Sequence, residues 1–381
     1  ASALAPDIGV MLAGRVLQGV GGGAMVAITY VATQSMFEER FWTRLMAVVS
    51  AIWGVSALCG PVIGGLFATA GLWRGAFWAF GGQAVLLAAT AAIFLRGLPR
   101  TSSGPRRVPL RPLAMLCAAT LAIAMAGVAP GALLAAGLGV LGLALLWLAA
   151  RLDARATARL MPRELLRLRH PVGAGLLMIV ALAVGSSSFT SYGPLLLEVL
   201  YRATPLVAGG VVAAGSVTWT VATLLTANLS HSWDRVLIRG GSVLVLLACA
   251  GFAAFVPRGP EAAIVACVLL QGAGFGMAWP FIVRRIVISA PRDERDIAAS
   301  ATSTMQRIGY AVGASACGIA ANMAGLREGA TLPAAHAVAF WVFAAFVPVL
   351  ALGCAAAMLL TTGTSLPLAR AERPVLGAGE G

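Results

Sequence analysis

Long apolar segments constrain this chain more than any other feature. A helix needs about 20 predominantly apolar residues to cross a bilayer, and the 381 residues contain eleven such segments. Apolar residues make up 60% of the chain and charged residues 11%, against roughly 45–50% and 25% in soluble globular chains. The chain is therefore predicted to be an all-α polytopic membrane protein. The segments lie at about 8–35, 46–68, 75–96, 112–130, 131–150, 171–197, 204–228, 237–256, 262–286, 297–325 and 336–361.

The basic residues indicate how the chain crosses the membrane. All 27 are arginines, and the loops on one side of the predicted spans hold 21 of them, whereas the opposite loops hold four. Because loops rich in arginine stay in the cytoplasm, the first set and the C-terminus are predicted to be cytoplasmic in a multi-pass protein of the cell membrane. We interpret the net charge of +13 as the effect of loop arginines that set the topology and contact anionic lipid head groups. We therefore expect no nucleic-acid partner.

The same pattern divides the chain into six regions. Eleven spans with a cytoplasmic C-terminus place Ala1 outside, so we expect an odd number of further spans upstream, and three would make fourteen. The predicted regions are a three-span remnant of an N-terminal bundle at 1–96, a cytoplasmic loop at 97–111, a two-span hairpin at 112–150, a cytoplasmic loop at 151–170, a six-span C-terminal bundle at 171–361 and a cytoplasmic tail at 362–381.

The stretch GRVLQGVGGGAM, residues 14–25, has two interpretations. A glycine loop that cradles the phosphates of a dinucleotide needs a preceding strand, and no strand-like run precedes these residues. In a membrane helix, Arg15, Gln18 and Gly22 share one face. An arginine at depth costs about 3 kcal/mol and needs a partner or water. We therefore expect Arg15 to face a cavity and Gly22 to admit a neighbouring helix.

The second apolar segment carries a stripe of small residues. They recur every four positions from Ser56 to Ala68, and another helix can lie closely along such a stripe. Pro61 removes a backbone hydrogen bond, so a kink or hinge is expected there. Ordinary tight packing explains the same pattern, and the residues alone leave both interpretations open.

These two stretches resemble motifs of the major facilitator superfamily. Residues 14–21 resemble the signature of its fourth helix, and residues 60–65 resemble the fifth-helix antiporter motif of its proton-coupled exporters. The hairpin at 112–150 is similar to the extra pair of spans in the fourteen-span drug/proton antiporter branch. The chain is identified on this resemblance as an N-terminally shortened member of that branch. The residues of the antiporter motif are Gly60, Pro61, Gly64 and Gly65.

Two stretches of the C-terminal half also resemble the family. Asp234, Arg235 and Arg239 resemble its cytoplasmic loop motif in degenerate form, because Leu237 stands where a glycine is expected. Residues 306–313 resemble its penultimate helix. Arg307 in that helix either faces the central cavity or extends to the membrane interface.

The resemblance implies a rocker-switch exporter rather than an enzyme. Two helical bundles would alternate access to a central site, and protons moving inward would drive a small amphipathic or drug-like substrate outward. Such a transporter needs no cofactor or metal, and we expect a monomer. Metabolite uptake by symport or by facilitated diffusion is the alternative within transport. A receptor that does not transport and an intramembrane enzyme are further alternatives, although no nucleophile motif or cluster of His, Asp and Glu supports catalysis.

Polar residues within the spans are the candidates for the transport site. A hydroxyl-rich stretch in the segment 171–197 could line the cavity, or its hydroxyls could bond back to their own helix. None of the 14 acidic residues lies at mid-membrane, so we expect Arg15 to pair with a carboxylate from a further helix. The coupling candidates are Arg15, Gln18, Gly22 and Arg307, and the cavity candidates are Ser187, Ser188, Thr190, Ser191 and Tyr192.

Overall fold

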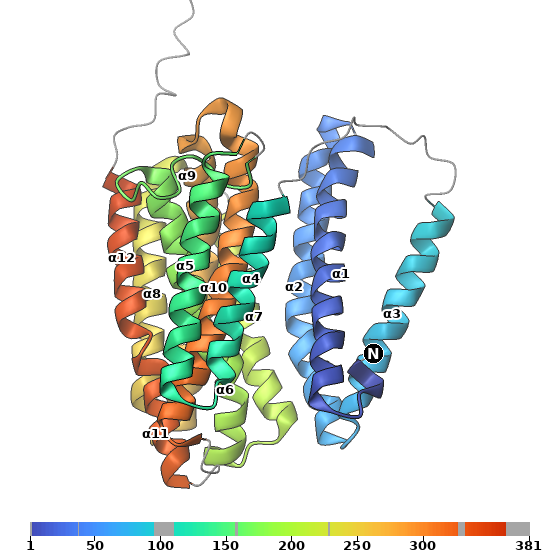
Figure 1. Cartoon of the computed structure of the whole chain (residues 1–381), viewed down its shortest axis with the longest axis vertical. Coiled ribbons are helices and arrows are strands. Elements are labelled where there is room, and N and C mark those ends of the chain that lie inside the picture. Colours follow the sequence, from blue (N-terminus) through green and yellow to red (C-terminus); the bar gives the residue numbers. More distant parts are fainter. Residues whose placement is uncertain are drawn as a thin grey trace, which may run out of the picture. The chain divides into compact units, whose positions relative to one another are not determined.

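The computed structural model describes residues 2–36, 38–94, 110–156, 159–227, 229–326 and 332–362, and its long elements are all α-helices (Figure 1). The all-α prediction is therefore confirmed. The α-helices are α1 (Ile8–Met36), α2 (Glu39–Thr69), α3 (Trp73–Phe94), α4 (Leu110–Val128), α5 (Ala132–Asp153), α6 (Pro171–Tyr201), α7 (Pro205–Thr226), α8 (Asp234–Phe255), α9 (Glu261–Ser289), α10 (Arg295–Met323), α11 (Leu332–Ala344) and α12 (Val347–Thr362). Most of the predicted loop 97–111 and of the predicted tail 362–381 lies outside the described residues.

The last predicted segment, 336–361, is two helices rather than one. Helix α11 ends at Ala344, and α12 begins at Val347. Pro348 explains the break, because a proline inside a helix has no N–H to donate and its ring clashes with the carbonyl four residues earlier, which here belongs to Ala344. Pro348 is tolerated in the first turn of α12, where the backbone N–H groups have no partner within the helix.

Ten stretches of described helix are long and apolar enough to cross a membrane, by length and composition alone. They join α11 with α12 and leave out α10. The predicted segment 297–325 is helical, but Ser, Thr, Gln and Arg side chains fill the first half of α10. Such side chains lower its hydropathy below that of a segment facing lipid.

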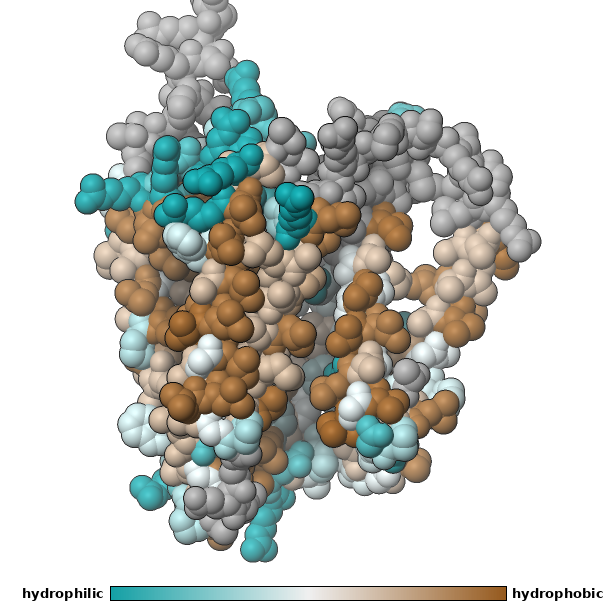
Figure 2. Space-filling model, viewed as in Figure 1, coloured by the Kyte–Doolittle hydropathy of each residue, from teal (hydrophilic) through white to brown (hydrophobic). Residues whose placement is uncertain are grey.

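The chain forms two compact units that share helices α6 and α7. The first unit comprises residues 1–106 and 193–220, and thus contains α1, α2, α3 and most of α7. The second comprises residues 107–192 and 221–381, and contains α4, α5, most of α6 and α8 to α12. Hydrophilic side chains gather at the upper end of the second unit in the view of Figure 2, and apolar side chains cover the middle of its helices.

The core of the second unit is built on α8. Phe252 of α8 stacks on Phe189 of α6 with ring centroids 4.5 Å apart, and it lies 5.3 Å from the ring of Phe343 in α11. Helix α8 also approaches α9 at two glycines, since a Cβ atom on Gly274 would lie only 2.6 Å from the carbonyl oxygen of Gly241. Glycine is required there because any side chain would push the two backbones apart.

Helix α10 is packed between α6 and α4. Gly309 lies against α6, where an added Cβ atom would be 2.6 Å from the Ala183 side chain. Gly318 lies against α4, where an added Cβ atom would be 2.6 Å from the carbonyl oxygen of Gly127. The two glycines are nine residues apart, which is about two and a half turns, and therefore face opposite ways. Asn322 also donates a hydrogen bond of 3.3 Å to the Gly127 carbonyl. The α4–α5 hairpin thus belongs to the same compact unit as α10.

We predict that Gly127→Val lowers the stability of the second unit. A Cβ atom at this position would lie 2.9 Å from the Ser315 Cα atom, and overpacking of this kind costs about 1–3 kcal/mol. The matched control is Gly137→Val in α5, where no described atom lies within 4 Å of an added Cβ. Thermal unfolding of the detergent-solubilised variants tests this. Equal unfolding temperatures for the two variants would contradict the packing of α4 on α10.

Candidate functional site

The guanidinium of Arg15 contacts neutral groups. Its Nη1 atom donates a hydrogen bond of 2.9 Å to Gln18 Oε1, one helical turn further along α1. Its Cζ atom lies 5.6 Å from the centre of the Phe77 ring in α3, within the range of a cation–π contact. Arg15 is exposed, and no ion pair joins it to a carboxylate of the described residues. The expected carboxylate partner therefore stays a prediction.

The glycine face of α1 is open. An added Cβ atom at Gly19, Gly21, Gly22 or Gly23 would have no neighbour within 4 Å among the described residues. A second helix could approach this face as closely as the sequence predicts. No described helix does so, and the predicted role of Gly22 stays a prediction.

The antiporter-motif residues lie in the second half of α2, and Gly65 touches α7. An added Cβ atom on Gly65 would be 2.6 Å from the carbonyl oxygen of Pro205 and 2.9 Å from the Leu206 Cα atom. Gly60 and Gly64 have no atom within 4 Å of an added Cβ in the described part of the chain. Of the three glycines, only Gly65 therefore packs closely against a described helix, which is α7.

Further contacts join α2 to the start of α7. An added Cβ atom on Gly209 of α7 would meet the carbonyl of Pro61. The backbone N–H of Leu206 donates a hydrogen bond of 3.2 Å to the Thr69 hydroxyl, which itself donates one of 2.8 Å to the Gly65 carbonyl. Backbone contact at two glycines and a shared hydroxyl hold α2 and α7 together within the first unit.

The hydroxyl-rich stretch of α6 is divided between buried and exposed positions. Ser187 and Ser188 are buried, and their hydroxyls donate bonds of 2.7 and 2.8 Å to carbonyls of their own helix. This arrangement agrees with the alternative in which the hydroxyls bond back to the helix. Thr190 and Ser191 are exposed and Tyr192 is half-buried, so these three side chains keep their predicted role as cavity candidates.

The predicted cytoplasmic loop motif forms contacts among three helices. Asp234, buried at the start of α8, forms an ion pair with Arg284 of α9. Arg239 Nε donates a hydrogen bond of 2.8 Å to the Thr361 hydroxyl of α12. Arg235 is exposed. Sequence reasoning missed Arg284, although the paired arginines 284 and 285 within an apolar segment are a visible signal of an interacting group.

Arg307 and the acidic residues complete the set of charged candidates. Arg307 is exposed on α10, one residue after Gln306, whose amide lies 3.3 Å from the Tyr310 hydroxyl. Each described acidic residue lies in a loop or within the first or last four residues of a helix. The acidic residue that lies deepest in a helix is Glu198, three residues before the end of α6. The described helices therefore carry arginine, but no carboxylate, in their middle parts.

Comparison with known proteins finds a transporter family and transporter relatives. The family described as Major Facilitator Superfamily matches residues 1–314. A probable multidrug-efflux transporter of Mycobacterium tuberculosis (strain CDC 1551 / Oshkosh) is 33% identical over 366 residues, which cover 90% of this chain and 75% of that protein. The probable multidrug-efflux transporter of strain ATCC 25618 / H37Rv gives the same values. Vacuolar basic amino acid transporter 5 of Saccharomyces cerevisiae is 34% identical over 89 residues, 23% of this chain and 15% of that protein.

We predict that Gly65→Ala weakens the contact between α2 and α7, whereas Gly60→Ala leaves it intact. The new methyl group at position 65 would overlap the α7 backbone, at a cost of about 1–3 kcal/mol. At position 60 it meets no described atom, and alanine favours a helix over glycine by about 1 kcal/mol. Thermal unfolding should therefore occur earlier for Gly65→Ala only. A Gly60→Ala variant that is equally destabilised would exclude this explanation.

We predict that Asp234→Asn destabilises the second unit by about 3 kcal/mol, because it leaves the charge of Arg284 without its buried partner. Arg235→Gln, at the neighbouring exposed position, should change the free energy of unfolding by less than about 0.5 kcal/mol. The double variant Asp234→Asn/Arg284→Gln should recover part of the loss. Chemical denaturation of the three variants measures this, and an Asp234→Asn protein as stable as wild type would show that the ion pair is dispensable.

Proposed function

Because this chain belongs to the major facilitator superfamily, we propose that it is a proton-coupled exporter of small amphipathic or drug-like compounds. The family match and the two mycobacterial relatives show that the protein is a multi-pass membrane transporter rather than an enzyme. Both relatives carry the name of probable multidrug-efflux transporters. That name supports an amphipathic substrate for this chain too, because the relative is 33% identical over 90% of the chain.

One observation carries the proposal of export. The residues that resemble the antiporter motif of proton-coupled exporters lie on α2, and at Gly65 they contact the start of α7. A glycine whose Cβ atom would overlap a neighbouring backbone cannot be exchanged without moving a helix. The resemblance at residues 60–65 is thus tied to a specific helix contact, as expected for a motif with a mechanical role.

Alternating access needs bundles that move as bodies, with the substrate bound near the middle of the membrane. The contacts within the second unit support its motion as one body. Its helices α8 and α9 meet at Gly241 and Gly274, and α10 meets α4 at Gly318. Backbones in such close contact resist sliding, because packed helices change position between discrete arrangements rather than continuously.

We propose that Arg15 couples the proton to the substrate. A carboxylate paired with an arginine has a lowered pKa, and protonation of that carboxylate releases the pair. Arg15 is suited to this exchange because its described contacts, the Gln18 amide and the Phe77 ring, are weak and neutral. Thr190, Ser191 and Tyr192 are the side chains that we propose to line the substrate path. The proposed partners are thus a small molecule and a proton, and the arginine-rich loops lie in the cytoplasm.

Metabolite uptake by symport, or facilitated diffusion, is the second candidate function. Facilitated diffusion is favoured by the positions of the described acidic residues, which all lie in loops or near helix ends. A proton carrier needs a group that titrates near the working pH, and arginine does not. A facilitator needs no such group.

Transport by the intact protein in lipid vesicles separates these functions. With an acidic lumen, an antiporter accumulates a fluorescent amphipathic cation inside, because protons leave as the cation enters. A symporter accumulates its substrate when the lumen is alkaline, and a facilitator equilibrates it in both cases. Accumulation with an acidic lumen, abolished by a protonophore, is the result that we expect. Accumulation only with an alkaline lumen would refute export.

We predict that Arg15→Gln reduces proton-driven accumulation at least tenfold, because glutamine cannot hold an ionised carboxylate. Arg258→Gln is the matched control, since Arg258 is exposed and lies in a loop between α8 and α9. The same vesicles measure both variants over a series of lumen pH values. An Arg15→Gln protein whose transport keeps the wild-type dependence on pH would rule out a coupling role for this residue.

A further inference from the structure

The turn formed by residues 164–170, which leads into α6, has a fixed conformation. Within it the backbone N–H of Arg167 donates a hydrogen bond of 3.0 Å to the Glu164 carbonyl, and that of His170 donates one of 2.9 Å to the Arg167 carbonyl. The turn rests on Gly173 in the first turn of α6, because a Cβ atom there would meet the carbonyl oxygens of Arg167 and Glu164. The turn is therefore a rigid platform rather than a loose loop.

The segment just before the turn uses its charges to hold the protein together. Glu294, buried between α9 and α10, forms ion pairs of 2.9 Å with Arg159 and 3.2 Å with Arg163. The buried carboxylate of Asp153 accepts bonds of 2.8 Å from the backbone N–H groups of residues 160 and 161. These contacts fasten the inner side of the segment to the second unit.

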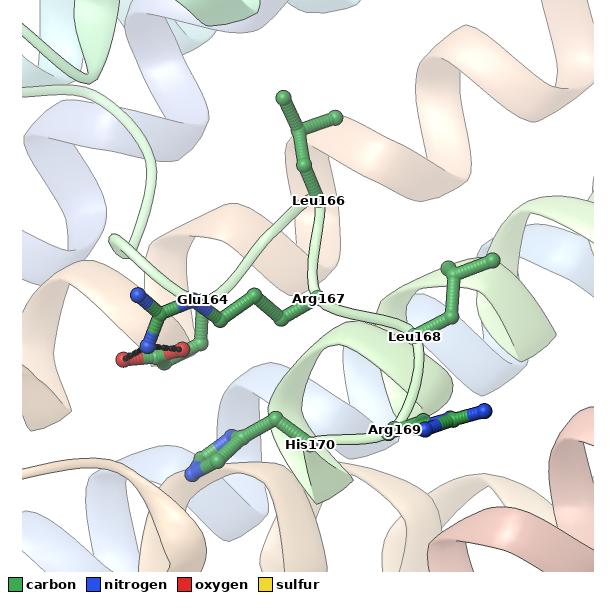
Figure 3. A pocket seen from close by; sticks show the side chains of 6 residues that line it. All are labelled: Glu164, Leu166, Arg167, Leu168, Arg169 and His170. Carbon is green, nitrogen blue, oxygen red and sulfur yellow. Dashed lines mark hydrogen bonds and ion pairs between the residues drawn. The ribbon is translucent and has the colours of Figure 1, made fainter.

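The outer side of the turn presents leucines and unpaired positive charge. Leu166 is 51% exposed and Leu168 is 49% exposed, and in Figure 3 both point away from the Glu164–Arg167 pair. Arg169 has no ion-pair or hydrogen-bond partner in the described part of the chain. An open hollow of about 630 Å³ is lined by these leucines together with Glu164, Arg167, Arg169 and His170.

The length of α6 places this turn at the membrane surface. Its 31 residues make a helix of about 46 Å, against about 40–45 Å for a bilayer with its head groups. The first residues of α6 therefore lie at the level of the head groups. Trp147 of α5 marks the same boundary, because its exposed ring lies 4.3 Å from the Arg151 guanidinium, and tryptophan and arginine are typical anchors there.

We propose that the turn 164–170 is a binding site for an anionic phospholipid. Arg169 contacts the phosphate of the head group, and Leu166 and Leu168 lie against the start of the acyl chains, whereas Arg167 is paired with Glu164 (Figure 3). Glu164 does not oppose this, since Arg167 Nη1 lies 3.1 Å from one of its carboxylate oxygens and neutralises it. Leucines interleaved with arginines suit the boundary between head groups and acyl chains, where both kinds of group find partners.

Titration of phosphatidylglycerol into the detergent-solubilised protein, followed by native mass spectrometry, tests the site. Each arginine near an anionic lipid surface strengthens binding by about fivefold, so Arg169→Gln should weaken it about fivefold. Arg167→Gln/Arg169→Gln should weaken it further, because Glu164 then carries an unpaired negative charge beside the lipid. Arg258→Gln should bind like wild type. Arg169→Gln removes no described contact, and an unchanged unfolding temperature without lipid verifies that it is folded.

A second pair of measurements distinguishes a lipid from a soluble anion. Leu166→Ser/Leu168→Ser should weaken binding of phosphatidylglycerol, and glycerol phosphate in solution should compete poorly with the lipid. Wild-type affinity for phosphatidylglycerol in the double arginine variant would overturn the proposal. So would an equally strong effect of glycerol phosphate combined with no effect of the leucine substitutions, because the site would then bind a free phosphate.

Discussion

Helices of this protein are held together where their backbones approach closely at small residues. Lipid tails are as apolar as leucine, so burial of apolar side chains does little to hold helices together in a membrane, and packing at small residues takes its place. Helices α8 and α9 meet at Gly241 and Gly274, α10 meets α6 at Gly309, and α2 meets α7 at Gly65. The mutual positions of these helices are therefore set by backbone contact at glycines.

Ion pairs and hydrogen bonds of buried carboxylates stabilise the second unit near the ends of its helices. The buried carboxylates Asp234 and Glu294 pair with arginines of other segments, and Asp153 caps a turn. These contacts fasten the arginine-rich segments of the second unit to its helices. Arg169, which these contacts leave without a partner among the described residues, is the arginine that we propose to contact a lipid phosphate.

Sequence alone predicted the helices well, because the length of an apolar run and the loops around it decide where a spanning helix lies. It missed the break before Val347, because Pro61, Pro194 and Pro280 lie inside unbroken helices and Pro348 alone therefore does not identify a break. It could not select Arg284 as the partner of Asp234, since the two lie 50 residues apart and several arginines were available. The helix expected beside Gly22 is not among the described ones, because a glycine face indicates that a neighbour fits without identifying it.

Proton exchange by this transporter, as we propose it, can be measured by letting the amphipathic substrate drive the protons. Vesicles containing the intact protein and a pH-sensitive dye start without a pH difference, and a fluorescent amphipathic cation is added outside. The account predicts that the lumen becomes alkaline as the cation enters, and that Gly65→Ala reduces the effect. A lumen that stays neutral while the cation enters, or that becomes acidic, would contradict proton antiport.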